Sequence, residues 1–181
     1  YTHDGEYWKF PKTTASPRPL QQPGPPIWVA ARDPNSHEFA VAQGCNVQVT
    51  PLHLGDEEVV SLMDRFNAAC AAHPEVPRPK IMVLRHAYVA DSEADAQLAA
   101  EEINKFYCYF GAWIKNERPI SQGLIQELTE DEIAAHPFYS AAAMRQNQII
   151  GEAAEVIGRI KSYEALGYDE FSFWIDTGMS F

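Results

Sequence analysis

The stretch PPIWVAARDPNS, residues 25–36, is the most informative part of this 181-residue chain. Its two leading prolines cannot donate to a strand ladder, so a strand starts after them. Residues 27–31 form a continuous apolar run, which is typical of a parallel strand covered on both faces. Asp33 and Ser36 are residue types that cap helices, and residues 37–42 continue at helical spacing. The stretch therefore predicts a buried strand, a short turn and a helix N-terminus.

A helix N-terminus directly after a strand is a place where an anion binds, because free backbone N–H groups and the positive end of the helix dipole face it. An ordinary strand–loop–helix joint with a good cap is the plainer interpretation of the spacing. Such joints occur throughout α/β proteins.

The alternation of strands and helices continues along the chain. The apolar runs predict strands at residues 27–31, 46–51, 80–90 and 170–175. The helical patterns cover residues 35–43, 56–72, 93–109 and 151–166. This order of elements indicates an α/β fold with a parallel sheet.

Several short motifs span nearly the whole chain in a fixed order. They are DGEYWKFP at 4–11, PRPLQ at 17–21, PPIWVAA at 25–31, GCN at 44–46, RHAYVADSEADA at 85–96, IIG at 149–151 and GYDEFSFW at 167–174. Together they resemble the bacterial-luciferase-like flavin monooxygenases. The resemblance implies a (β/α)8 TIM barrel that binds reduced FMN or a deazaflavin.

The chain is short for such a barrel, which typically needs about 250 residues. The resemblance implies that residues 1–181 are a single domain covering the C-terminal half, with strands 5–8. Half a barrel leaves open sheet edges and an exposed apolar interior. We therefore expect further strands of a longer polypeptide, or another copy, to complete the core. Residues 1–26 are expected to be an extended connection.

The rhythm of strands and helices lapses over residues 106–148, which are rich in aromatic residues. Long excursions at the carboxyl face of a barrel often form lids and substrate walls. A cluster that packs on the outer helices, or on another subunit, is the equal alternative. Within the excursion, Thr129 followed by three acidic residues predicts a helix start.

The resemblance also implies a cofactor site, since the family holds the FMN phosphate at the loop after the fifth strand. It places Ala30 and Ala31 beside the flavin ring. Asp33 and Ser36 stand at two positions where the family has hydroxyl residues. Ser36 keeps its hydroxyl, whereas the Asp33 carboxylate repels a phosphate unless Arg32 compensates. Alternatively, Asp33 turns away to cap the helix.

No catalytic residue can be assigned from the sequence. His86 lies on a predicted strand, where a lone histidine is more often a hydrogen-bonded core residue than a base. Trp174 is expected in the core. In the family, catalytic polar residues come largely from the first four strands. The three scattered cysteines form no Cys-x-x-Cys pair, so no metal site is predicted.

The composition limits the class of partner. Fourteen basic against 25 acidic residues give a net charge of -11, whereas nucleic-acid binding needs a basic footprint. The sequence contains no run of about 18 apolar residues, so no membrane-spanning helix is predicted. We expect a cytoplasmic protein whose partners are a small-molecule substrate, a flavin reductase and further copies of itself as a homo-oligomer.

Three functions fit the resemblance. The first is a monooxygenase that uses O2 and reduced FMN from a separate reductase, the flavin itself performing the oxygen activation. The second is a deazaflavin-dependent dehydrogenase on the same barrel. The third is a non-catalytic flavin-binding or subunit-interaction protein.

Overall fold

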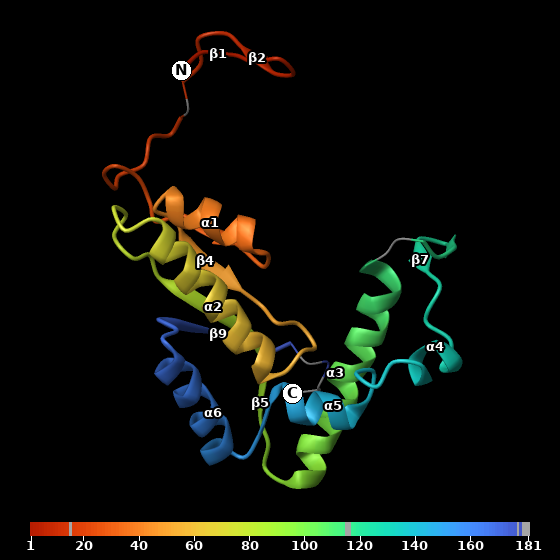
Figure 1. The fold of residues 1–181 in the computed structure, drawn as a ribbon. Coiled ribbons are helices and arrows are strands. Elements are labelled where there is room, and N and C mark those ends of the chain that lie inside the picture. The colour runs from red at the N-terminus through yellow and green to blue at the C-terminus, as the bar shows by residue number, and fades with distance from the viewer. Residues whose placement is uncertain (15, 115–116, 177, 179–181) are drawn as a thin grey trace.

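The computed structural model describes residues 1–14, 16–114, 117–176 and 178. Its main sheet holds five strands: β3 (Trp28–Ala30), β4 (Asn46–Val49), β5 (Ile81–Val89), β8 (Ile149–Gly151) and β9 (Glu170–Trp174) (Figure 1). The helices are α1 (Pro34–Ala42), α2 (Asp56–Ala72), α3 (Glu93–Ile114), α4 (Glu130–Ala134), α5 (Ala141–Asn147) and α6 (Ala153–Leu166). Two small hairpins pair β1 (His3–Asp4) with β2 (Lys9–Phe10), and β6 (Ile120–Ser121) with β7 (Leu124–Ile125).

The long strand β5 organises the main sheet. It pairs with β4 near its start, with β9 through its middle and with β8 at its end, in parallel each time. Strand β3 extends the sheet beyond β4, also in parallel, with Trp28 opposite Asn46. The parallel α/β arrangement predicted from the alternating elements is therefore confirmed.

One face of the sheet carries the hydrophobic core. Successive side chains of a strand point to opposite faces, and alternate residues of β4 and β5 pack under the helices. Val47, Val49, Ile81 and Val83 lie there with side chains of α1, α2 and α6. Helix α2 contributes Leu62 and Phe66, both fully buried.

Within the described residues, a helix meets the opposite face of the sheet only near the end of β5, where His86 contacts Phe106 and Tyr107 of α3. This face carries Trp28, Gln48, Met82, Leu84 and Ser172, all of them only half-buried. In a closed barrel this face is the interior and is filled by side chains from every strand. The chain thus forms a section of barrel wall, with its helices outside.

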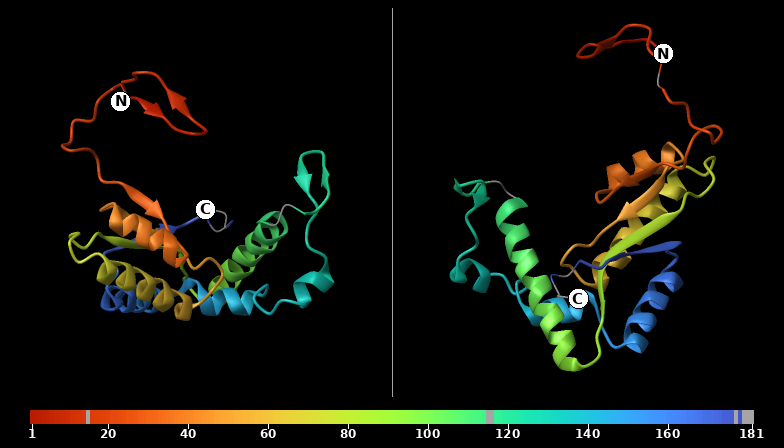
Figure 2. Two further views of the ribbon diagram at one scale, coloured as in Figure 1. Left: turned by 45° about the horizontal axis from the view of Figure 1, so that its top comes forward. Right: turned by 180° about the vertical axis from the view of Figure 1, so that it is seen from behind.

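The N-terminal segment differs from the expected extended connection, because residues 3–10 close into a hairpin in which His3 lies opposite Phe10. The hairpin stands away from the sheet in all three ribbon views (Figure 2). Its aromatic side chains are largely exposed, with Tyr7 at 83% and Trp8 at 70%.

Two other element boundaries differ from the prediction. Helix α3 continues beyond residue 109 to Ile114, because Ala112 remains in the buried stripe of the helix. The excursion therefore starts later than residue 106, and its residues 115–116 lie outside the described part. The helix predicted at residues 151–166 starts at Ala153 instead, because Gly151 ends strand β8 with a φ of +153° that helices do not use.

Candidate cofactor and substrate site

The carboxyl ends of the parallel strands meet at one edge of the sheet, where ligands bind in barrels of this kind. The turn after β3 leads into α1, and residues 50–55 connect β4 to α2. The strand β9 ends at Trp174, which lies opposite His86 of β5. These segments make up the candidate site.

The N-terminus of α1 is already occupied by a carboxylate. Asp33 is the N-cap, and its Oδ1 accepts hydrogen bonds from the backbone N–H groups of Asn35 at 3.0 Å and Ser36 at 3.1 Å. The Ser36 hydroxyl donates to Asp33 Oδ2 at 2.7 Å. These bonds, the hydroxyl first, hold the pKa of Asp33 below its ordinary value. Asp33 thus caps the helix, which is one of the two expected alternatives.

The other predicted cofactor residues divide between two environments. Arg32 is exposed beside the cap, and its backbone N–H donates to Ser36 Oγ at 3.2 Å. Ala30 is exposed at the end of β3. Ala31 is only 5% exposed and belongs to the core beneath the helices. The structure brings Arg32, Asp33 and Ser36 together, whereas the side chain of Ala31 is buried in the core.

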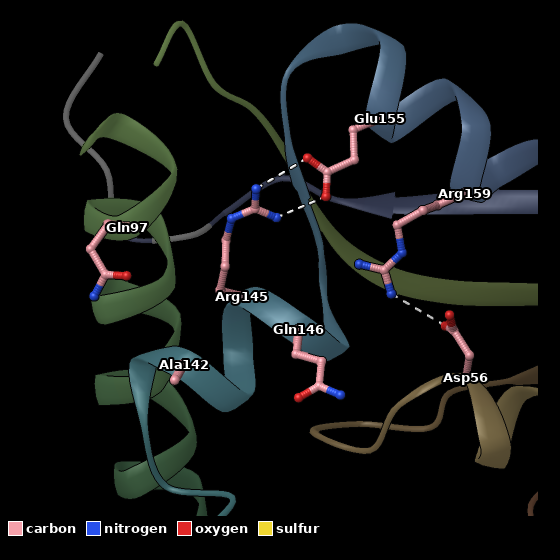
Figure 3. Close-up of a pocket in the computed structure, with 7 residues that line it drawn as sticks. All are labelled: Asp56, Gln97, Ala142, Arg145, Gln146, Glu155 and Arg159. Atoms are coloured by element: carbon pink, nitrogen blue, oxygen red, sulfur yellow. Dashed lines mark hydrogen bonds and ion pairs between the residues drawn. The ribbon is translucent and has the colours of Figure 1, made fainter. Parts of the chain in front are cut away.

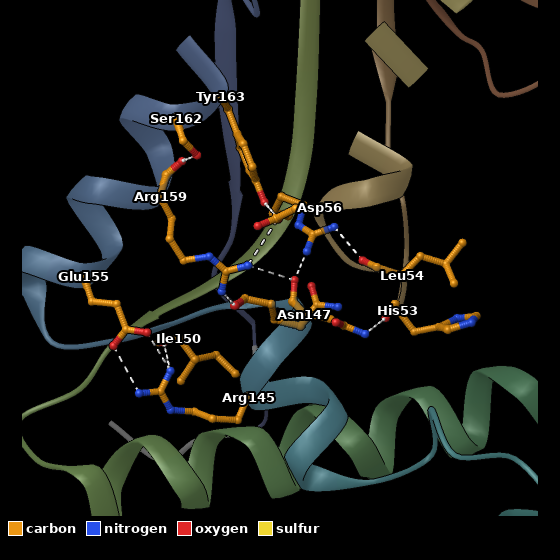
Figure 4. A network of polar contacts seen from close by, with 12 residues as sticks. His53, Leu54, Asp56, Arg145, Asn147, Ile150, Glu155, Arg159, Ser162 and Tyr163 are labelled. Atoms are coloured by element: carbon orange, nitrogen blue, oxygen red, sulfur yellow. Dashed lines mark hydrogen bonds and ion pairs between the residues drawn. The ribbon is translucent and has the colours of Figure 1, made fainter. Parts of the chain in front are cut away.

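The connection between β4 and α2 is held by three side chains from distant parts of the chain. The carbonyls of residues 52–54 accept hydrogen bonds, in order, from Gln148 Nε2 at 2.9 Å, Asn147 Nδ2 at 3.0 Å and Arg85 Nη1 at 2.9 Å. We call Arg85, Asn147 and Gln148 the loop clamp; Figure 4 labels Asn147 of the clamp together with His53 and Leu54 of the loop. Arg85 also donates to the Asn147 carbonyl. Leu52 takes a φ of +56°, which is uncommon for a residue other than glycine.

Arg85 is buried, with 1% of its surface exposed. Burial is the main reason that its pKa lies below the ordinary value for arginine. Within the described residues, its side-chain hydrogen bonds run to the backbone carbonyls of Leu54 and Asn147 rather than to a carboxylate. Arg85 lies within one of the sequence motifs. Its contact with the loop could not be predicted, because the clamp residues are 31 to 96 positions away from the loop residues that they bind.

Aromatic side chains continue from the sheet edge into the excursion. We call His53, His86, Phe106, Tyr107, Phe138 and Trp174 the aromatic wall. The ring of His86 stacks on Trp174, with centroids 4.2 Å apart, and meets Tyr107 edge-on at 5.4 Å. Tyr107 also contacts His53 edge-on at 5.8 Å, and His53 stacks on Phe138 at 4.4 Å. The excursion thus lies against the site edge through Phe138.

His86 differs from the expected hydrogen-bonded core histidine. It is 1% exposed, and within the described residues neither of its ring nitrogens has a hydrogen-bond partner. Burial, together with the positive charge of Arg85, lowers the pKa of His86 to about 4. The imidazole is therefore neutral at pH 7. Trp174 is half-buried, so it lies at the border of the core.

A hollow of about 510 Å³ lies beside the start of α6 (Figure 3). Its lining includes Arg145, Glu155, Arg159 and Asp56. Arg145 Nη1 lies 2.9 Å from Glu155 Oε1, and Arg159 Nη2 lies 3.3 Å from Asp56 Oδ1. Both guanidinium groups are thus paired with carboxylates. The residues that line the hollow form an ion-pair network that connects α2, α5 and α6.

The described residues contain no group of three or more His, Cys, Asp or Glu side chains arranged to hold a metal ion. None of their helices combines the length and the apolar character that crossing a membrane requires.

Comparison with known proteins places these observations in a family. Residues 1–170 match the luciferase-like monooxygenases, and the chain belongs to that family. It is 71% identical over all 181 residues to the flavin-dependent trigonelline monooxygenase, oxygenase component, of Acinetobacter baylyi, and covers 50% of that protein. It is also 32% identical to the uncharacterized protein y4vJ of Sinorhizobium fredii, again over 50% of the relative. The chain therefore spans about half the length of the curated relatives it matches.

Solved structures give the same fold. The monooxygenase RslO1 from Streptomyces bottropensis matches with a TM-score of 0.66 at 22% identity, over 96% of this chain and 47% of that one. An F420-dependent secondary alcohol dehydrogenase matches with a TM-score of 0.65 at 13% identity, over 96% and 49%. The oxygenating constituent of 3,6-diketocamphane monooxygenase of Pseudomonas putida, in complex with FMN, matches with 0.61 at 17%, over 97% and 51%. The predicted luciferase-like TIM-barrel fold, of which the chain covers about half, is confirmed.

Proposed function

We propose that this chain is the C-terminal half of the oxygenase component of a flavin-dependent monooxygenase. The observation that supports this most is the 71% identity, across the whole chain, with an oxygenase component. In the proposal, a separate reductase supplies reduced FMN, and the bound flavin supplies oxygen activation. The proposal also includes that the protein is cytoplasmic, that it forms a homo-oligomer, and that residues 1–181 belong to a single domain.

The proposed substrate is trigonelline or a related pyridinium carboxylate, after the named substrate of that relative. Trigonelline carries a cationic aromatic ring and a carboxylate. Aromatic side chains bind such rings through stacking and cation–π contacts, and the aromatic wall offers several.

The residues at the α1 N-terminus fit an FMN phosphate in part. Arg32 is exposed and brings a positive charge, whereas the Asp33 carboxylate fills the helix N-terminus. We propose that the phosphate binds beside Arg32 and Ser36 and that Asp33 limits its affinity. The open face of the sheet, at Ala30, is the proposed place of the ring. There the protein orients the flavin and excludes water.

The proposed function is tested on the complete protein with FMN and a flavin reductase. We expect trigonelline to stimulate O2 consumption and to give an oxygenated product. A deazaflavin dehydrogenase is the second candidate, supported by the shared fold with the F420-dependent alcohol dehydrogenase. Tight deazaflavin binding with hydride transfer, and no trigonelline-dependent O2 consumption, would support that candidate instead. A protein that binds flavin without either reaction is the third alternative.

Asp33→Ser is expected to strengthen FMN binding. The change removes a negative charge beside the phosphate and releases the Ser36 hydroxyl, which now donates to Asp33. Ser36→Ala should weaken binding roughly tenfold to hundredfold, because a hydrogen bond to a charged group contributes about 1.5–3 kcal/mol. Isothermal titration of the complete protein measures both, with Asp33→Asn as the charge-only control. If neither Asp33→Ser nor Ser36→Ala changes the Kd by more than twofold, the phosphate binds elsewhere.

A further inference from the structure

We propose that His53 is a substrate-binding residue, whose imidazole donates a hydrogen bond to the carboxylate of the aromatic substrate. We further propose that the loop clamp of Arg85, Asn147 and Gln148 positions it. This inference rests on the proposed function and adds to it a site residue that sequence patterns do not single out.

The first observation is how firmly the backbone around His53 is held. Three consecutive carbonyls, at residues 52–54, each accept a hydrogen bond from a side chain 31 to 96 residues away. One of those donors is the buried Arg85, and taking a charged group out of water is costly. The turn between β3 and α1, by contrast, is capped by its own Asp33. The loop before α2 is therefore held by more long-range hydrogen bonds than a connection between a strand and a helix requires.

The second observation is the backbone conformation within the same loop. Leu52, the residue before His53, has a φ of +56°. A residue with a side chain persists in this region only when its surroundings impose it, and such residues cluster at binding sites. The hydrogen bond from Gln148 to the Leu52 carbonyl, at 2.9 Å, is one such constraint. The clamp and the strained residue thus act on one short segment.

The third observation is the orientation of the His53 ring. In Figure 4 the His53 ring points away from Asn147, while the His53 backbone carbonyl points toward it. The ring stacks on Phe138 and meets Tyr107 edge-on. Among the described residues, no hydrogen bond to either of its ring nitrogens is found, and the side chain is half-buried rather than enclosed. The ring is held in place with its polar atoms available to a ligand.

The surroundings of His53 favour a flat ligand that carries a hydrogen-bond acceptor such as a carboxylate. Tyr107 and Phe138 offer aromatic surfaces beside the imidazole. Burial and the positive charge of Arg32 lower the pKa of His53, so the neutral ring, with one N–H donor, is the main form at pH 7. The excursion that carries Phe138 is the segment expected to form a substrate wall. An aromatic carboxylate meets all of these features.

The experiment uses the complete protein with FMN and reductase, and compares trigonelline with 1-methylnicotinamide, which replaces the carboxylate by a neutral amide. His53→Phe keeps an aromatic ring and removes both nitrogens. We expect it to raise the KM for trigonelline about tenfold to hundredfold. The FMN Kd should stay within about threefold, and the affinity for 1-methylnicotinamide should fall by less than about tenfold, because a hydrogen bond to its neutral amide carbonyl is weaker than one to a carboxylate. His53→Gln, which keeps a donor, should restore most of the affinity for trigonelline.

A matched control is His136→Phe. His136 also stacks on Phe138, with centroids 5.2 Å apart, but lies outside the clamped loop. It should leave the KM for trigonelline unchanged. Asn147→Leu tests the positioning role. It should raise that KM in the wild type but add little to His53→Phe, because residues that act through one another are not additive.

Because the comparison of two ligands is made within one variant, a general distortion of the site in His53→Phe weakens both ligands and does not imitate the expected result. An unfolded fraction lowers the maximal rate and leaves the KM unchanged. An unchanged preference for trigonelline over 1-methylnicotinamide in His53→Phe overturns the inference. So does a loss of FMN binding with the substrate KM unchanged, which would place His53 against the flavin. If the wild type neither binds nor turns over trigonelline, the proposed function fails, and this role of His53 fails with it.

Discussion

Residues 1–181 expressed alone are expected to aggregate or to remain partly folded. Within the described residues, most of the sheet face opposite α1, α2 and α6 is uncovered, and Trp28, Met82 and Leu84 are only half-buried on it. Ile27 and Ile175 are 61% and 70% exposed. Exposed apolar surface and unpaired strand edges both promote association. Size-exclusion chromatography with light scattering, and binding of a hydrophobic dye, measure the result.

The matched control adds the missing part of the barrel. The remaining half of the 71% identical Acinetobacter baylyi protein, co-expressed or fused to these residues, should restore a soluble species that unfolds cooperatively. A monodisperse monomer of residues 1–181 that unfolds cooperatively, without dye binding, would contradict the expectation that further strands cover this face.

Arg85→Met is expected to have the largest effect of any single substitution considered. It leaves the carbonyls of Leu54 and Asn147 without their buried donor. Hydrogen bonds to charged groups contribute about 1.5–3 kcal/mol each, so the loss should be roughly 3 kcal/mol even after methionine fills the space. The Tm of the complete protein, which is about twice as long as this chain by comparison with its relatives, should fall by roughly 3–5 °C. Thermal unfolding followed by circular dichroism measures it.

Lys80→Met is the control for Arg85→Met, since it also replaces a cationic side chain by methionine, at the residue directly before β5. Lys80 Nζ lies 2.9 Å from Glu170 Oε1, but the lysine side chain is 61% exposed. Exposed ion pairs contribute little to stability, so the Tm should hardly move. Equal shifts in the two variants would show that Arg85 does not clamp the loop.

Elements whose pattern is local could be predicted closely. The predicted helix at residues 56–72 has the same bounds as α2, because its apolar residues recur at helical spacing and acidic residues open it. The end of α3 was harder, since residues 106–114 are aromatic and small and signal neither helix nor loop. The three-residue strand β8 is too short to give a period, and it exists because it pairs with the end of β5.

The candidate site divides in the same way. The Asp33 cap joins residues only two and three positions apart, so it could be predicted from the sequence as one of two alternatives for Asp33. His86 was predicted in the core, which is confirmed, whereas its expected hydrogen bond was wrong, because only the packing of Trp174 and Tyr107 decides what surrounds the ring. The assignment of FMN to Ala30, Ala31, Arg32, Asp33 and Ser36 stays a prediction.

The sequence by itself determined the alternation of strands and helices, the family and the cap of α1, because each depends on neighbouring residues or on motifs in a fixed order. Only the tertiary structure decided the clamp on residues 52–54 and the orientation of His53. The hydrogen bonds of the clamp join residues up to 96 positions apart. Contacts over such separations leave no period or spacing in a sequence, and they arise only when β5 and the α5–β8 turn are folded against the loop.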